Sequence, residues 1–129
     1  MSGGRRPFNM KFDLKHHETH VAIAASGPWE LMDVFGAFEL LHRECRERKC
    51  SKGLLDLREV TGQPAQMDWF YLGERVASMP DPKPKIAVVH PAEFEARFAE
   101  TTAANRGAVM HVFSDPGEAL RWLLEGLAP

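Results

Sequence analysis

Short apolar segments alternate with longer amphipathic segments along most of this sequence, and this alternation limits its fold more than any other feature. The segments 54–60, 86–89 and 108–113 are rich in aliphatic residues and short enough to be buried strands. Apolar residues three or four positions apart follow each of them, which predicts amphipathic helices. A chain that alternates in this way places its strands in parallel, joined by right-handed crossovers. The sequence therefore predicts an α/β fold.

A hairpin is expected before this alternation begins. Alternating apolar and polar residues predict two strands joined by a tight turn between Phe8 and Gly27. Gly27 and Pro28 are residue types that favour a helix N-cap and first helical position, so a long helix is expected to follow them and to end near Cys50. The complete expectation is a mixed, mainly parallel sheet of about five strands with four helices packed on it.

Three further helices are expected after the later strands. The first is predicted from Trp69 to Met79, because Pro80 denies it a backbone donor. The second is predicted to open at Pro91. The last begins at the sequence 115–118, Asp-Pro-Gly-Glu, which has the pattern of a capping box with proline at the first helical position.

Length and composition favour one ordinary globular domain. The chain has 129 residues, of which 44% are hydrophobic and 26% charged, and residues 1–7 are expected to form a flexible tail. The formal net charge is −2, with acidic and basic residues interleaved, so nucleic acid is not an expected partner. Neither a transmembrane segment nor a secretion signal is predicted, which favours a cytoplasmic protein.

The sequence contains two groups of metal-binding residue types, and neither predicts a metal site or a cofactor. Cys45 and Cys50 lie five positions apart at a predicted helix end, so their side chains are expected to diverge and to be poorly placed for a disulfide. His16 and His17 are adjacent in a strand and point to opposite faces, so at most two of His16, His17 and His20 converge. A solvent-exposed turn is the favoured interpretation of these histidines.

Three segments resemble a known family. They are the sequence Gly53-Leu54-Leu55-Asp56-Leu57-Arg58, the sequence 85–89 before a helix, and the ending 112–123. Together they resemble the anti-sigma-factor-antagonist-like domains, known as the STAS-like or SpoIIAA-like family, over nearly the whole chain from about Phe8. The resemblance implies a STAS/SpoIIAA-like fold and a non-catalytic binding or regulatory domain.

The signalling members of this family carry a phosphorylated serine directly after the Leu-Asp-Leu strand. This sequence has no Asp-Ser-Ser-Gly signature there, and Thr61 is the hydroxyl-bearing residue of the segment 58–69. A phosphorylation switch is therefore not expected from the resemblance, and Thr61 is a candidate by elimination. The divergent SpoIIAA-like branch generally lacks the switch and is linked in fold to lipid-binding domains.

Polar residues at the carboxyl ends of the predicted strands are the candidate ligand-binding residues, because ligands of open α/β sheets gather at that edge. Arg58 would hold an acidic group, and hydroxyl groups would donate hydrogen bonds. The expected partner is another protein or a small ligand, lipid-like or anionic; the alternative is that strand ends simply carry polar loop residues. The candidates are Ser26, Arg58, Thr61, His90 and Ser114.

Two further hypotheses stay open at this point. One is a small enzyme in which His90, at a strand end, is the general base, although no nucleophile motif or phosphate-binding glycine loop accompanies it. The other is a homodimer, for which the charged segment 11–15 would supply an unpaired edge strand.

Overall fold

A five-stranded mixed sheet forms the centre of the protein. The computed structural model describes residues 9–93 and 95–125, so the tail expected at residues 1–7 lies outside the described residues. The strands lie side by side in the same order as in the chain, with the first two antiparallel and the rest parallel. They are β1 (Lys11–His16), β2 (Val21–Pro28), β3 (Lys52–Thr61), β4 (Lys85–Val89) and β5 (Met110–Phe113).

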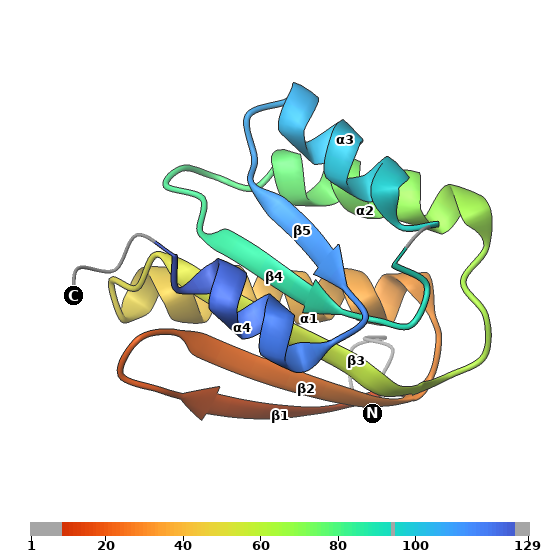
Figure 1. Cartoon of the computed structure of the whole chain (residues 1–129), viewed down its shortest axis with the longest axis horizontal. Helices are drawn as coiled ribbons and strands as arrows, with labels where there is room; N and C mark the ends of the chain where they lie inside the picture. The colour runs from red at the N-terminus through yellow and green to blue at the C-terminus, as the bar shows by residue number, and fades with distance from the viewer. Residues whose placement is uncertain (1–8, 94, 126–129) are drawn as a thin grey trace, which may run out of the picture.

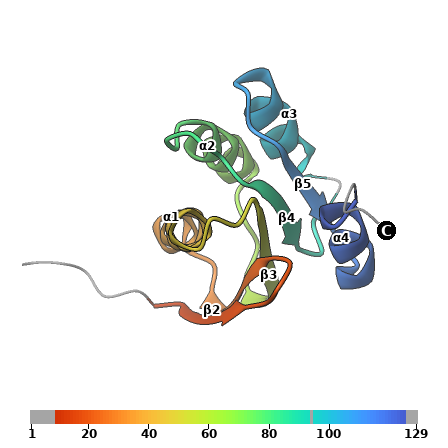
Figure 2. The same cartoon turned by 90° about the vertical axis from the view of Figure 1, so that its left-hand side faces the viewer.

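The helices cover the two faces of the sheet unequally (Figures 1 and 2). Successive right-handed crossovers between neighbouring strands place their helices on the same face. These helices are α1 (Leu31–Glu47), α2 (Gln66–Ala77) and α3 (Arg97–Asn105). The helix α4 (Pro116–Leu123), which follows the last strand, lies on the opposite face. The predicted mixed, mainly parallel sheet with four helices is confirmed.

Alternate residues of each strand face the two helical layers. Ile23, Leu55 and Val88 are at most 1% exposed and pack toward the α1–α3 layer, where Phe38 and Leu41 of α1 meet them. On the other face, a smaller cluster joins the strands to α4: its buried members are Ala87, Val89, Ala119 and Leu123. The main hydrophobic core is therefore the three-helix side of the sheet.

The first helix begins later than the sequence pattern suggests. Strand β2 continues through Gly27 and Pro28, and the N-cap of α1 is Glu30. Gly27 has φ +111°, a conformation that suits glycine, and it follows an irregularity in the pairing of β2 with β3. The Trp29 N–H then donates to the Thr61 carbonyl at 2.9 Å. Pairing with β3 therefore delays the helix, and the expected cap at Gly27 was wrong.

The third helix also begins later than expected. The segment after Pro91 first makes a turn, in which the Ala96 N–H donates to the Ala92 carbonyl at 3.0 Å, and the regular helix starts at Arg97. The capping interaction expected at the last helix is present, since the Asp115 carboxylate accepts a hydrogen bond from the backbone of Glu118 at 2.8 Å.

Glutamate side chains bond to the backbone of the final strand on its free side. The Val112 N–H donates to Glu100 Oε2 at 2.8 Å, and the Ser114 N–H donates to Glu93 Oε1 at 2.6 Å. Glu93 lies in the segment between β4 and α3, and Glu100 lies in α3. The hydrogen bonds to Ser114 lower the pKa of Glu93, which favours the charged, accepting form.

The two cysteines lie closer together than the sequence suggested. Lys49 has φ +54°, so the chain turns back sharply after α1. The Cys50 N–H then donates to the Cys45 carbonyl at 2.8 Å. The expectation that the two side chains diverge assumed a continued helix, and it was wrong.

Candidate functional site

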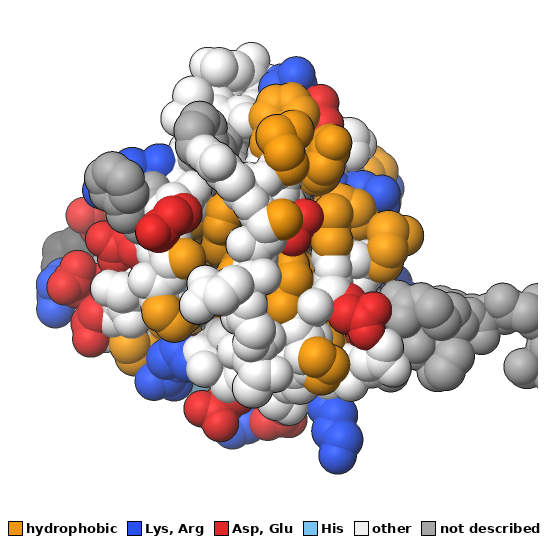
Figure 3. All heavy atoms as spheres, turned by 90° about the vertical axis from the view of Figure 1, so that its right-hand side faces the viewer, with side chains coloured by type: hydrophobic (Ala, Val, Ile, Leu, Met, Phe, Trp, Pro, Cys, Tyr) orange, Lys and Arg blue, Asp and Glu red, His pale blue; other side chains and the backbone are white. Residues whose placement is uncertain are grey.

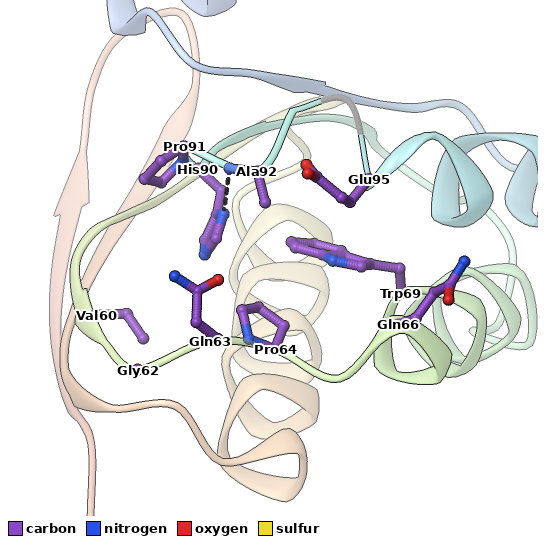
Figure 4. Close-up of a pocket in the computed structure, with 10 residues that line it drawn as sticks. All are labelled: Val60, Gly62, Gln63, Pro64, Gln66, Trp69, His90, Pro91, Ala92 and Glu95. Atoms are coloured by element: carbon purple, nitrogen blue, oxygen red, sulfur yellow. Dashed lines mark hydrogen bonds between the residues drawn. The ribbon is translucent and has the colours of Figure 1, made fainter.

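A cavity of about 510 Å³ lies at the carboxyl ends of β3 and β4 (Figure 4). It is bounded by the loop after β3, the first turn of α2 and the segment that follows β4. This is the edge of the sheet at which a ligand of an α/β fold is expected. Its lining residues are Val60, Gly62, Gln63, Pro64, Gln66, Trp69, His90, Pro91, Ala92 and Glu95.

Three aromatic rings from three different segments meet beside this cavity. Trp69 and His90 have ring centroids 5.1 Å apart in an edge-to-face arrangement, and Trp29 lies 5.5 Å from Trp69 and 5.8 Å from His90. Trp29 is fixed from outside the group, because its indole N–H donates to Asp68 Oδ2 at 2.9 Å. Trp69 and His90 therefore form an aromatic wall of the cavity, and Trp29 contacts both rings from outside the lining.

The His90 ring offers a hydrogen-bond donor to the cavity. Its Nδ1 accepts a hydrogen bond from the Ala92 N–H at 2.9 Å, so the proton of the neutral ring is on Nε2. Figure 4 shows that nitrogen directed toward Gln63, away from the bond to Ala92. Burial lowers the pKa of His90, and the charge of Glu95 opposes this only in part, so the ring is neutral at pH 7.

The remaining polar groups of the lining are carboxamides and a carboxylate. Gln63 and Gln66 each carry one acceptor and two donor hydrogens, and the Glu95 carboxylate points toward the space between His90 and Trp69 (Figure 4). The described lining contains neither lysine nor arginine. This arrangement is suited to a group that donates to Glu95 and accepts from His90.

Of the five residues expected at the site, His90 lines the cavity. Thr61 is exposed and lies between two lining residues, with its carbonyl bonded to Trp29. Ser26 pairs with Glu59 in the sheet, and Ser114 bonds through its N–H to Glu93. The strand ends therefore do not bring the five together in one pocket.

Arg58 is engaged elsewhere. Its guanidinium forms a two-nitrogen contact with the Asp56 carboxylate, at 3.0 to 3.1 Å from Nε and 2.8 Å from Nη2. Burial raises the pKa of Asp56, but its bonds to Arg58 and the attraction of that charge outweigh burial and lower it overall. Because Asp56 and Arg58 are two positions apart in a strand, they share one face and form a local ion pair.

Trp69, Trp29 and Glu95 are site residues that the sequence did not single out. Trp69 is 2% exposed and belongs to the main hydrophobic core, and Trp29 is partly buried against that core. Glu95 lies in the turn before α3, a segment expected to be regular helix. The sequence signal that would have pointed to this region is the loop Gly62-Gln63-Pro64 shortly before α2, since all three of its residues line the cavity.

The histidines of the β1–β2 hairpin separate as their alternation suggested, but the solvent-exposed interpretation was wrong for His20, which is 7% exposed. His17 and His20 stack with centroids 4.6 Å apart, whereas His16 Nε2 lies 2.7 Å from Glu44 Oε1 of α1. Within residues 9–93 and 95–125, no three histidine, cysteine or acidic side chains are grouped to hold a metal ion.

A second hollow lies between α1 and α2, with a volume of about 460 Å³. Leu31, Phe35 and Tyr71 contribute its apolar lining, and Arg75 lies 4.2 Å above the Phe35 ring and is paired with Glu39. Figure 3 faces the end of the molecule where both helices begin and shows hydrophobic side chains gathered there. None of the helices described is long and apolar enough to span a bilayer.

The His90 pKa gives a testable property of the cavity. We expect the His90 ring to titrate below its ordinary value of 6.5 in an NMR pH series of the ring protons. Because the unfolded chain takes up this proton first, the free energy of unfolding should fall as pH drops through 6.5 toward the folded pKa.

A His90→Gln variant serves as the control for that pH dependence. The free energy of unfolding of this variant should change less over the same pH range. The contribution of His20 should remain, because the pKa of His20 is also lowered, mainly by burial and then by the charge of His17. A His90 resonance with its midpoint above 6.5 would contradict the assigned environment.

Comparisons with known proteins identify the fold. No protein-family model and no curated protein sequence matches the chain. An anti-sigma factor antagonist from Mycobacterium paratuberculosis superposes with a TM-score of 0.56 at 12% identity, covering 90% of this chain and 95% of that one. An uncharacterized protein with a SpoIIAA-like fold from Shewanella loihica has a TM-score of 0.52 at 19% identity, covering 93% and 98%. The chain therefore has the SpoIIAA-like, STAS-like fold that the resemblance implied.

Proposed function

We propose that this chain is a non-catalytic regulatory domain that binds a partner protein through the end of the molecule where α1 and α2 begin. The binding area, here called the α1–α2 surface, consists of Leu31, Met32, Phe35, Met67 and Tyr71. The observation that carries the proposal is that Met32, Met67 and Tyr71 are 60%, 53% and 43% exposed. Tyr71 lines the hollow between α1 and α2, and Met67 lies one turn before it on α2. Exposed apolar groups beside a hollow are typical of protein-binding sites.

The composition of this surface suits protein recognition. Methionine side chains adapt to irregular partner surfaces, and tyrosine combines a large apolar area with a polar hydroxyl. The ion pair between Arg75 and Glu39, at 2.7 Å, adds a polar border beside the Phe35 ring. An apolar centre with a charged rim is the usual anatomy of an interface.

The cavity beside His90 favours binding over catalysis. Its histidine presents an N–H donor rather than a free base, and the described lining contains no serine, threonine or cysteine. A donor, a carboxylate and an aromatic wall fit a neutral or basic group with both donor and acceptor atoms. We infer that the cavity accepts such a group from the partner or from a small ligand bound with it.

The regulatory part of the proposal draws on the fold neighbours. One of them is named as an antagonist of an anti-sigma factor, which is itself a regulatory protein. We propose by analogy that the partner of this chain is a regulatory protein.

The α1–α2 surface is tested by site-specific photo-crosslinking in cells. A crosslinking amino acid in place of Tyr71 should capture a partner that the same group in place of Val109 does not. Val109 is the control because it is 54% exposed but lies beside β5, outside the α1–α2 surface. Once the captured protein is purified, the affinity of the wild type for it is measured by calorimetry.

Met67→Asp should then weaken that affinity at least about tenfold, because it places a charge in an apolar contact. A new acid in the first turn of α2 favours the helix, so unfolding would not explain the loss. Val109→Asp is the matched control and should bind like the wild type. Equal affinity of the Met67→Asp and Val109→Asp variants would overturn the proposed surface.

A further inference from the structure

We propose that Cys45 and Cys50 form a dithiol site that a peroxide oxidises to an intramolecular disulfide. The inference is independent of the proposed partner surface, because the cysteines lie at the carboxyl-terminal end of α1, whereas that surface surrounds the start of the helix.

The backbone around the two cysteines has the hydrogen bonds of a Schellman motif, the αL-terminated helix end. Lys49 is in the left-handed region at φ +54°, and its N–H lies 3.2 Å from the Arg46 carbonyl. The Cys50 N–H bonds to the Cys45 carbonyl at 2.8 Å. In this motif the side chains at the two ends of the longer bond frequently contact each other, and here the residues at those two positions are both cysteines.

Both sulfur atoms point toward the same carbonyl oxygen. Cys45 Sγ lies 3.5 Å from the Lys52 oxygen, and Cys50 Sγ lies 3.4 Å from it. The two thiols therefore lie on the same side of the turn, beside one carbonyl oxygen.

A separate cavity gives small molecules access to this pair. It has a volume of about 300 Å³, and both cysteines line it together with Arg46, Lys49 and Lys83. Cys50 is half-buried, whereas Cys45 is 2% exposed. Cys50 is the more accessible sulfur, so Cys50 is the group that meets the oxidant first.

Cys45 is suited to the second step. Burial, followed by the nearby Cys50 and Glu44, raises the pKa of Cys45 to about 12, so it stays protonated and resists direct attack on peroxide. Once Cys50 is oxidised and uncharged, its repulsion of a Cys45 thiolate disappears. Proximity then favours the intramolecular reaction over collision with a second oxidant molecule.

The reaction balances with hydrogen peroxide as the oxidant. The Cys50 thiolate attacks one peroxide oxygen, the O–O bond breaks, and the departing hydroxide takes a proton to become water, which leaves a sulfenic acid. The sulfur of Cys45 then attacks Sγ of Cys50 as it loses its proton. The S–O bond breaks, a second water leaves, and the S–S bond forms. Two thiols lose two electrons, and one peroxide becomes two waters.

The experiment uses the reduced full-length chain with a small excess of hydrogen peroxide. The expected result is the loss of both thiols and a decrease of about 2 Da in intact mass, with a peptide map that links residues 45 and 50. In Cys45→Ser the second step is impossible, so Cys50 should gain oxygen and advance to sulfinic acid. Two free thiols after treatment of the wild type would overturn the proposal.

Two variants at position 49 test whether the turn is responsible. Lys49→Gly and Lys49→Val both remove the charge, but glycine accepts the left-handed conformation and valine opposes it. Disulfide formation should be about tenfold slower in Lys49→Val than in Lys49→Gly, since the valine variant populates the closed turn less. Circular dichroism confirms that both are folded. Equal rates would show that the turn does not bring the thiols together and would overturn the geometric basis.

Discussion

Replacing Gly73 with alanine is expected to lower the free energy of unfolding by about 3 kcal/mol, near the upper end of ordinary overpacking costs. A Cβ atom on Gly73 would lie 2.5 Å from the Ala99 carbonyl oxygen and 2.8 Å from Cβ of Thr102. The closer atom is backbone of α3, so α2 and α3 would have to move apart. Urea unfolding followed by circular dichroism measures the change.

Helix propensity alone would make Gly73→Ala stabilising, so the sign of the change in the free energy of unfolding shows whether the close contact is present. Alanine is favoured over glycine within a helix by about 1 kcal/mol, so a loose contact between α2 and α3 would make Gly73→Ala stabilising. Gly117→Ala is the comparison, because its Cβ would meet a side-chain oxygen of Asp115, the one that caps α4, at 3.1 Å, a contact that a shift of a few tenths of an ångström relieves. That change should stay below about 1 kcal/mol. A Gly73→Ala protein as stable as the wild type would contradict the close packing of the helices.

Asp33→Ala is expected to cost about 3 kcal/mol, because it removes a buried side-chain acceptor from two backbone donors. Asp33 is fully buried in the first turn of α1, and its Oδ2 accepts from the N–H groups of Asn9 and Met10 at 2.8 and 3.2 Å. These bonds attach the segment before β1 to the helix. Thermal or urea unfolding measures the loss.

Asp33→Asn is the graded control, because its carboxamide retains one oxygen acceptor. It should fall between the wild type and Asp33→Ala in stability. Amide exchange at Met10 should be faster in Asp33→Ala than in Asp33→Asn, since the alanine variant leaves that N–H without this acceptor. Unchanged exchange in both variants would contradict the assigned role.

Local chain chemistry made most of the fold predictable. The apolar runs of β3, β4 and β5 and the cap at Asp115 follow rules that act over a few residues, and the structure has them. The start of α1 was misplaced because a bond from Trp29 to a distant residue of β3 extended the sheet. Local residue preference carries no information about that pairing.

The candidate site was less predictable because side-chain direction depends on register and turn handedness. Arg58 is in β3 and pairs with Asp56 two positions earlier, whereas His90 lies just beyond the end of β4 and turns into the cavity. Lys49 gave no sign of a left-handed turn, because glycine is the usual residue there. A prediction from residue spacing alone therefore placed the two cysteines apart, whereas the turn at Lys49 brings them closer together.

The hydrogen bonds of Glu93 and Glu100 have a consequence for how the sheet meets other chains. A foreign strand that joined β5 would need the N–H groups of Val112 and Ser114, which carboxylates already occupy. Those carboxylates would also repel an acidic added strand, and they would lose their own hydrogen-bond partners if that strand paired with β5. The addition of a further strand is therefore impeded at the β5 border of the sheet.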